Sequence, residues 1–163
     1  MSDLVFRAMT FARHAHREQK RKYTGNPYVD HLAEVAGITA AVTNWPEAIA
    51  IAWLHDCMED QGITESVLID KFGLMVAHGV AYLSDMETGN RAQRKQLSRD
   101  RLAAAPGWIQ TIKCADLISN TSSIVEHDPA FAKVYLEEKR LLLAAMTKAD
   151  PRLRDIAKAQ AGI

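Results

Sequence analysis

The sequence predicts an all-α protein folded as a compact helical bundle, and two observations carry this prediction. No stretch alternates apolar and polar residues in the way that a half-buried strand does. Apolar residues instead recur at three- and four-residue spacing along nearly the whole chain, in segments separated by short breaks rich in glycine and proline. No internal repeat, low-complexity tract or linker interrupts the pattern, so we expect a single domain over residues 1–163.

The helices of the first half can be justified in order. The first is capped by Ser2 or Asp3 and ends before the break KYTGNP, and the second runs from about 27 to 43. The sequence NWPE places a cap before Pro46, where a third helix begins and continues to about Asp60. The apolar stripe of the first helix is Leu4, Val5, Ala8, Met9, Ala12 and Ala15, and that of the second is Val35, Ile38 and Val42.

The second half continues the pattern with shorter and more charged helices. Helices are expected over 62–72 and 74–83, followed by the loop SDMETGN and a strongly charged helix over 91–105. Pro106 and Gly107 end that helix, and the next one covers about 108–122. Asp-Pro pairs then start the last two helices, over about 129–148 and from 151 onward.

Composition and charge limit the kind of protein this can be. The apolar fraction of 48% and the charged fraction of 25% are ordinary for a soluble globular protein. Twenty basic and twenty acidic residues give zero net charge, which argues against wholesale binding to nucleic acid or to an anionic membrane. Cys57 and Cys114 lie in apolar segments, as buried thiols in a reducing compartment do. With no signal peptide and no membrane-length apolar run, we expect a cytoplasmic protein.

The stretch AIAWLHDCMED suggests a metal site on the third helix. An apolar run ends in His55 and Asp56, and a second acidic pair, Glu59 and Asp60, follows one turn later. On a continuous helix these four side chains lie along one stripe. Burying such groups is costly unless something compensates them, and a cation would do so.

Two other stretches offer ligands for the same ion. PYVDHLAEVA sets His31 near the start of an apolar helix face, and TIKCADLISN sets Asp116 inside an apolar run. Together with His55 and Asp56 they form a mixed nitrogen and oxygen set, which suits Mn²⁺, Fe²⁺ or Zn²⁺ better than Mg²⁺ or Ca²⁺. Four protein ligands leave positions open for water and substrate, which favours a catalytic metal over a structural one.

These motifs carry a family resemblance. The order His, His-Asp, Asp resembles the HD superfamily of metal-dependent phosphohydrolases. AHREQKRKYTGNPYVDH, LHDCMED and KCADLISN, in this order, resemble more narrowly the hydrolase domain of RelA/SpoT-type enzymes and the small alarmone hydrolases. The resemblance covers about residues 5–125. It implies an all-α bundle of the HD-domain type around one Mn²⁺, which removes the 3′-pyrophosphate from guanosine tetra- or pentaphosphate.

The resemblance also implies a role for each site residue. His31, His55, Asp56 and Asp116 would hold the metal, while Glu59 and Asp60 would orient the nucleophilic water and manage protons at the leaving 3′-oxygen. Leu32 stands where the family usually has proline, Leu117 stands where the long enzymes have arginine, and the loop before GNPY has one residue more than theirs. These departures touch the nucleotide side more than the metal side. The expected substrate-binding residues are Arg21, which would pack against the base, Lys22, Thr24, Lys113, Asn120 and Ser123.

Local charge also fits a small polyphosphate as the ligand. Five basic residues lie within positions 13–22 and five more within positions 91–101, each group opposed by a single acid. A neutral protein with two such clusters fits a nucleotide polyphosphate better than DNA.

The residues leave other functions open. The same metal site could serve a phosphomonoesterase acting on another nucleotide or a phosphorylated cofactor, or a module that binds nucleotide without turning it over. Asp116 could be a buried acid paired with Lys113, and Glu59 and Asp60 a solvated helix end. Guanosine against adenosine, the cellular metal and the oligomeric state are not decided by the sequence.

Overall fold

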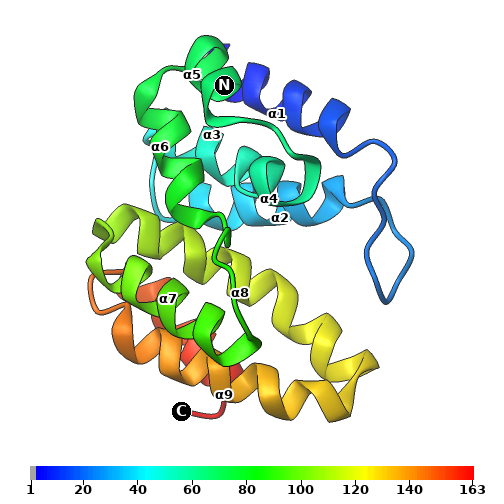
Figure 1. Cartoon of the computed structure of the whole chain (residues 1–163), viewed down its shortest axis with the longest axis vertical. Coiled ribbons are helices and arrows are strands. Elements are labelled where there is room, and N and C mark those ends of the chain that lie inside the picture. Colours follow the sequence, from blue (N-terminus) through cyan, green and yellow to red (C-terminus); the bar gives the residue numbers. More distant parts are fainter. Residues whose placement is uncertain (1–2) are drawn as a thin grey trace. The chain divides into compact units, whose positions relative to one another are not determined.

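The protein is helical throughout the part that is described. The computed structural model describes residues 3–163, and within them the chain forms ten α-helices and no named strand (Figure 1). One isolated antiparallel bridge joins Lys20 to Pro27. The prediction of an all-α fold is confirmed. Ser2, one of the two expected caps of the first helix, lies outside the described residues.

The chain divides into two compact units, one ending at Ser84 and the other covering Asp85–Ile163. A single domain over 1–163 stays a prediction. Unit 1 contains α1 (Asp3–Ala15), α2 (Val29–Ala40), α3 (Pro46–Leu54), α4 (Cys57–Gln61), α5 (Glu65–Phe72) and α6 (Leu74–Leu83). Unit 2 contains α7 (Arg91–Ala104), α8 (Gly107–His127), α9 (Pro129–Ala145) and α10 (Pro151–Gln160).

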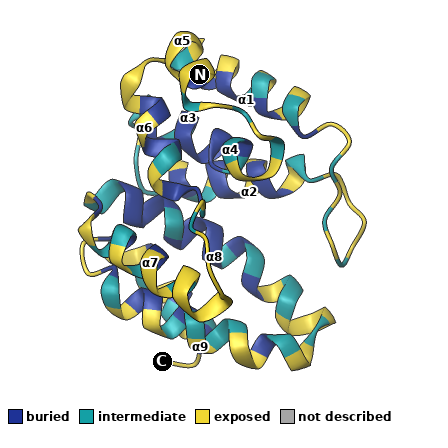
Figure 2. Ribbon diagram, in the orientation of Figure 1, coloured by how far each residue is buried: buried dark blue, intermediate teal, exposed yellow. Residues whose placement is uncertain are grey.

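Helix α3 forms the centre of unit 1. It packs against α1, α2 and α6, and its residues from Ala50 to Leu54 are all buried (Figure 2). An apolar helix without a polar stripe is the kind expected in a core, because each of its faces meets another element. The predicted inward stripe of α1 is present in part, since Val5, Ala8 and Ala12 are buried there.

Helix α8 has the same central place in unit 2, where it packs against α7, α9 and α10. Ile109, Ile112 and Leu143 are fully buried in this core. Lys139 of α9 is buried with them, and its ammonium donates to Thr121 Oγ1 at 2.7 Å and to Gln160 Oε1 at 2.9 Å. Burial lowers the pKa of Lys139 to about 8.

The turn between α9 and α10 is tied to the start of α8. The buried Gln110 side chain accepts a hydrogen bond from the Lys148 backbone N–H at 2.8 Å and donates to the Leu102 carbonyl at 2.8 Å. Thr111 Oγ1 accepts from the Asp150 N–H at 2.8 Å. Two side chains of one helix turn therefore hold the backbone of a distant turn in place.

One element prediction is wrong, and it concerns the candidate site. The third helix does not continue to Asp60: α3 ends at Leu54, His55 and Asp56 form a turn, and α4 begins at Cys57. Asp56 has φ −98° and ψ 0°, away from regular helical values. The four polar side chains therefore do not share one helical stripe. The other predicted helices are present, with ends that differ by up to five residues.

Candidate metal centre

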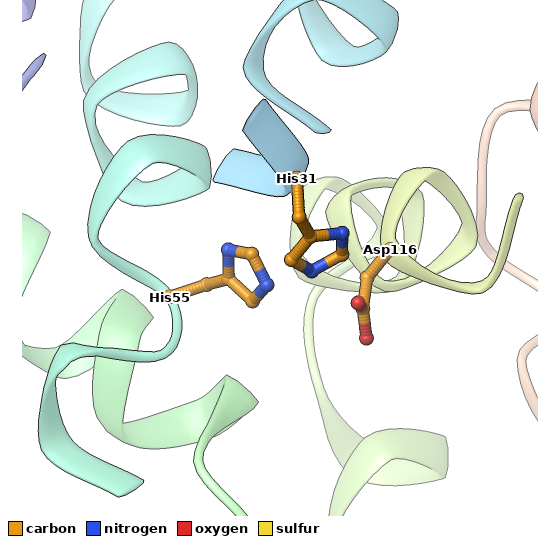
Figure 3. Close-up of side chains that lie close together, drawn as sticks. All are labelled: His31, His55 and Asp116. Carbon is orange, nitrogen blue, oxygen red and sulfur yellow. The ribbon is translucent and has the colours of Figure 1, made fainter. Parts of the chain in front are cut away.

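In unit 1, two histidines and an aspartate bring their side chains to one point. His55 Nε2 lies 3.0 Å from Asp56 Oδ2, and His31 Nε2 lies 3.5 Å from the same oxygen. The two imidazole centroids are 5.3 Å apart (Figure 3). Both histidines are buried, while a small part of Asp56 is exposed. Three of the four predicted ligands therefore meet within one unit.

The break between α3 and α4 is what lets neighbouring residues meet. Adjacent residues of a continuous helix point about 100° apart, because the helix has 3.6 residues per turn. At the break, His55 Nδ1 lies 2.7 Å from the Ala52 carbonyl, one of the last-turn acceptors of α3. An Nδ1–H donated to that carbonyl leaves Nε2 with the lone pair that a metal ligand needs.

Tyr28 is a site residue that the sequence reasoning missed. Its hydroxyl donates to Asp56 Oδ2 at 2.7 Å, and its ring meets His31 edge to face with centroids 5.4 Å apart. The available signal was its position three residues before His31, since side chains three apart lie on one helix face. Tyr28 is the residue that precedes α2.

The two predicted catalytic acids lie on α4 and are exposed, and they differ in their surroundings. Asp60 Oδ2 accepts a hydrogen bond from Gln19 Nε2 at 2.8 Å. Gln19 Oε1 in turn accepts from Gln61 Nε2 at 2.6 Å and lies 2.6 Å from His16 Nδ1. Asp60 is thus held by a glutamine network, and Glu59 lies beside it in the middle of the short helix α4.

The surroundings of Cys57, the cysteine beside the site, make its thiol unreactive. Cys57 is fully buried, and its Sγ lies 3.6 Å from His16 Nε2. Burial raises the pKa of the Cys57 thiol to about 12, and the charges of Asp56 and Asp60 add to this effect. The thiol is therefore protonated at neutral pH and packs as a small apolar group.

The loop before α2 carries the first basic cluster and closes on itself. Arg21 N donates to the Asn26 carbonyl at 2.8 Å, and Tyr28 N donates to the Gln19 carbonyl at 3.0 Å. Between these ties, Gly25 has φ 73°, a conformation that glycine adopts without steric cost. The predicted substrate residues of this loop are Arg21, whose guanidinium carbon lies 5.7 Å from the Tyr28 ring centroid, Lys22, which lies over the Tyr23 ring, and the exposed Thr24.

In unit 2, the predicted ligand Asp116 is a buried carboxylate on α8, and Figure 3 draws its side chain as well. Lys113 Nζ lies 2.8 Å from its Oδ2, and Asn120 Nδ2 donates to its Oδ1 at 2.7 Å. The ion pair that the sequence left open is therefore present. Two carboxylate oxygens have about four acceptor sites, so this pairing leaves room for a further ligand bond. Ser123, on the same helix, is half-buried.

Ion pairs within unit 2 take up much of the second basic cluster. Arg91 contacts Glu138 through two hydrogen bonds of 2.7 and 2.8 Å, and Lys95 and Arg101 both contact Asp85. Burial by itself would raise the pKa of Asp85, but nearby lysines and donated hydrogen bonds hold it well below the usual range. This cluster is therefore less available to an anionic ligand than its sequence indicated.

Comparison with known proteins identifies the family. A model described as HD domain matches residues 8–108, more than half of the chain, and the chain belongs to this family. The family and the predicted resemblance to RelA/SpoT-type proteins are thereby confirmed.

The curated relatives bear alarmone-related names. The chain is 31% identical over 146 residues to a guanosine-3′,5′-bis(diphosphate) 3′-pyrophosphohydrolase of Aquifex aeolicus, covering 88% of this chain and 20% of that protein. It is 32% identical over 145 residues to a probable GTP diphosphokinase of Arabidopsis thaliana, covering 82% of this chain and 20% of the relative. The mouse pyrophosphohydrolase MESH1 is 29% identical over 119 residues, which are 71% of this chain and 66% of MESH1. The chain thus spans about a fifth of the first two relatives.

A solved structure shares the fold. It is described as a metazoan ortholog of SpoT that hydrolyzes ppGpp, and it matches with a TM-score of 0.90 at 22% identity, covering 98% of this chain and 94% of that one. The prediction of an HD-type helical fold is confirmed by this match. Among residues 3–163, no helix is long and apolar enough to cross a membrane.

Proposed function

We propose that the protein is a metal-dependent pyrophosphohydrolase of alarmone-like nucleotides. The observation that carries the proposal is the approach of His55 Nε2 and His31 Nε2 to Asp56 Oδ2, at 3.0 and 3.5 Å. In a buried place, two neutral imidazoles and a carboxylate form a donor set for a divalent transition metal. We assign one Mn²⁺ to it, with Asp116 as the fourth ligand on the strength of the family motif.

The chemistry follows from the groups of this chain. A divalent ion bound there would lower the pKa of a coordinated water and offset phosphate charge. Glu59 and Asp60 are carboxylates one turn beyond Asp56, and we assign them to the proton transfers at the water and at the leaving 3′-oxygen. The hydrogen bond from Gln19 to Asp60 keeps that carboxylate in one position, which suits an orienting role.

The substrate assignment rests on the basic loop and on the relatives. Arg21 and Lys22 supply positive charge ten and nine residues before His31 in the chain, and a small anionic nucleotide is the ligand that such a cluster attracts. Guanosine-3′,5′-bis(diphosphate), which is guanosine tetraphosphate, is the substrate that the relatives' names indicate, and the pentaphosphate is added on the strength of the family resemblance. We assign Lys113, Asn120 and Ser123 of α8, together with Thr24, to the same nucleotide.

The test is product analysis with a metal-stripped protein. Guanosine tetraphosphate is incubated with and without Mn²⁺, and the products are separated by ion exchange. The proposal predicts Mn²⁺-dependent formation of GDP and pyrophosphate in equal amounts. Lack of turnover, in protein that calorimetry shows to bind Mn²⁺, would reject the substrate while keeping the metal site.

Two other functions are outcomes of the same experiment. A phosphomonoesterase would release orthophosphate in place of pyrophosphate, and adenosine analogues and phosphorylated cofactors would then be tested in turn. A module that only binds nucleotide would retain it unchanged with Mn²⁺ present. We rank this last, because both carboxylates needed for proton transfer are present on α4.

A further inference from the structure

The Tyr28 side chain contacts both the proposed metal ligands Asp56 and His31 and Arg21 of the proposed substrate loop. Its hydroxyl donates to Asp56 Oδ2 at 2.7 Å. Its ring contacts three other side chains: His31 at 5.4 Å between centroids, His16 at 5.3 Å in a stacked arrangement, and the Arg21 guanidinium carbon at 5.7 Å.

Asp56 needs such a contact because of where it lies. It occupies the turn between α3 and α4, with φ −98° and ψ 0°. An aspartate can rotate about two side-chain torsions, so a short hydrogen bond from a phenol fixes which oxygen faces the histidines. Outer hydrogen bonds of this kind orient metal ligands and tune their affinity.

Tyr28 can do this because it is itself fixed. Its N–H donates to the Gln19 carbonyl at 3.0 Å, and its carbonyl accepts from His31 N at 3.0 Å. The stacked ring of His16 is buried and held by Gln19, with His16 Nδ1 2.6 Å from Gln19 Oε1. The phenol is thus anchored by its backbone and by one face contact.

We infer that Tyr28 is a positioning residue with two separable roles. The hydroxyl fixes Asp56 for metal binding, and the ring holds Arg21 at the place where the nucleotide is proposed to bind. The inference rests on the proposed function and deepens it, because it assigns metal affinity to one atom of Tyr28 and nucleotide affinity to the ring.

Two substitutions separate the roles. Tyr28→Phe removes the hydroxyl and keeps the ring, and Tyr28→Leu removes both. Tyr23→Phe is the matched control, because Tyr23 lies in the same loop and its hydroxyl meets the Lys22 ammonium at 3.3 Å. Mn²⁺ affinity is measured by calorimetry on metal-stripped protein without nucleotide, and KM for guanosine tetraphosphate is measured at saturating Mn²⁺.

We expect Tyr28→Phe to weaken Mn²⁺ binding about 10–100-fold, the range seen when such outer partners are removed. Its KM at saturating metal should stay at the wild-type value, while Tyr28→Leu should lose metal affinity and also raise KM. Tyr23→Phe should bind Mn²⁺ as the wild type does. Circular dichroism and melting of the metal-free variants show whether each one is folded.

The failures can be told apart. Wild-type protein that binds no Mn²⁺ would overturn the proposed metal site and this inference with it. If the wild type binds Mn²⁺ and Tyr28→Phe binds it with the same affinity, the role of the hydroxyl is overturned and the proposed function stays intact. A KM in Tyr28→Leu equal to that of Tyr28→Phe would overturn the role of the ring.

Discussion

A single methyl group at Gly107 should destabilise unit 2. Gly107 is the first residue of α8, and a Cβ built there would lie closer to the Lys148 carbonyl oxygen than real Cβ contacts allow. The carbonyl carbon and the Cβ of Lys148 would follow at 3.3 and 3.4 Å. The Gly107→Ala substitution can therefore be accommodated only if the backbone of the turn at Lys148 moves.

The magnitude follows from what holds that turn. The Lys148 N–H is bonded to Gln110 and the Asp150 N–H to Thr111, so moving the backbone stretches two hydrogen bonds of about 1 kcal/mol each. Overpacking itself costs about 1–3 kcal/mol, and the higher helix propensity of alanine returns up to about 1 kcal/mol. We expect a net loss of about 2–4 kcal/mol, or about 4–16 °C in Tm.

The assay is equilibrium unfolding in urea, with Gly37→Ala as the matched control. Gly37 lies inside α2, and a Cβ there meets nothing within 4 Å. Gly37→Ala should therefore raise stability by about 0.5–1 kcal/mol, while Gly107→Ala lowers it with an unchanged m value. A Gly107→Ala protein as stable as the wild type would show that the turn yields freely and refute the reasoning.

Three further predictions concern charge and the site. Because burial lowers the pKa of Lys139 to about 8, the unfolded chain binds more protons at this residue between that pH and the ordinary value of 10.5, so Lys139 contributes stability that rises with pH across this window. The buried Cys57 and Cys114 thiols, whose pKa is raised to about 12, contribute the opposite trend, so the comparison is between variants: relative to Lys139→Met, wild-type urea midpoints should rise with pH, and an identical pH profile would contradict this. Asp56→Ala should abolish Mn²⁺ binding in calorimetry, and retained affinity would remove Asp56 from the ligand set. Glu59→Gln should keep Mn²⁺ and lose about 10²–10⁴-fold in turnover, so full turnover would exclude a proton-transfer role.

Helix periodicity predicted most of the fold, because the helices are amphipathic or apolar and most of them are separated by glycine or proline. The helix over 74–83 has the predicted bounds. The break after Leu54 could not be predicted, since no glycine or proline marks it. At this break the His55 side chain contacts the backbone: its Nδ1 lies within hydrogen-bond distance of the Ala52 carbonyl, so a side chain competes with the helical backbone for that acceptor.

The sequence predicted some residues of the candidate site and missed others. Motif order indicated His31, His55 and Asp56, and these meet in unit 1. Tyr28 and Gln19 escaped notice because tyrosine and glutamine have no distinctive spacing as metal-site partners, and their roles depend on the closed loop. The sequence overestimated how available the basic cluster at 91–101 is to an anionic ligand. Its acidic partners could not be identified, because Asp85 and Glu138 are distant in sequence or lie on another helix.

The loop before α2 closes on itself, and its tip can therefore accept substitutions and insertions at little cost in stability. Its base is pinned by backbone bonds at Gln19, Arg21, Asn26 and Tyr28, so residues added or exchanged at the tip need not shift His31. The extra residue before GNPY that the family resemblance implies would fall in this same loop. Substitutions at the tip can therefore change the charge of the loop while the backbone leading to His31 keeps its place.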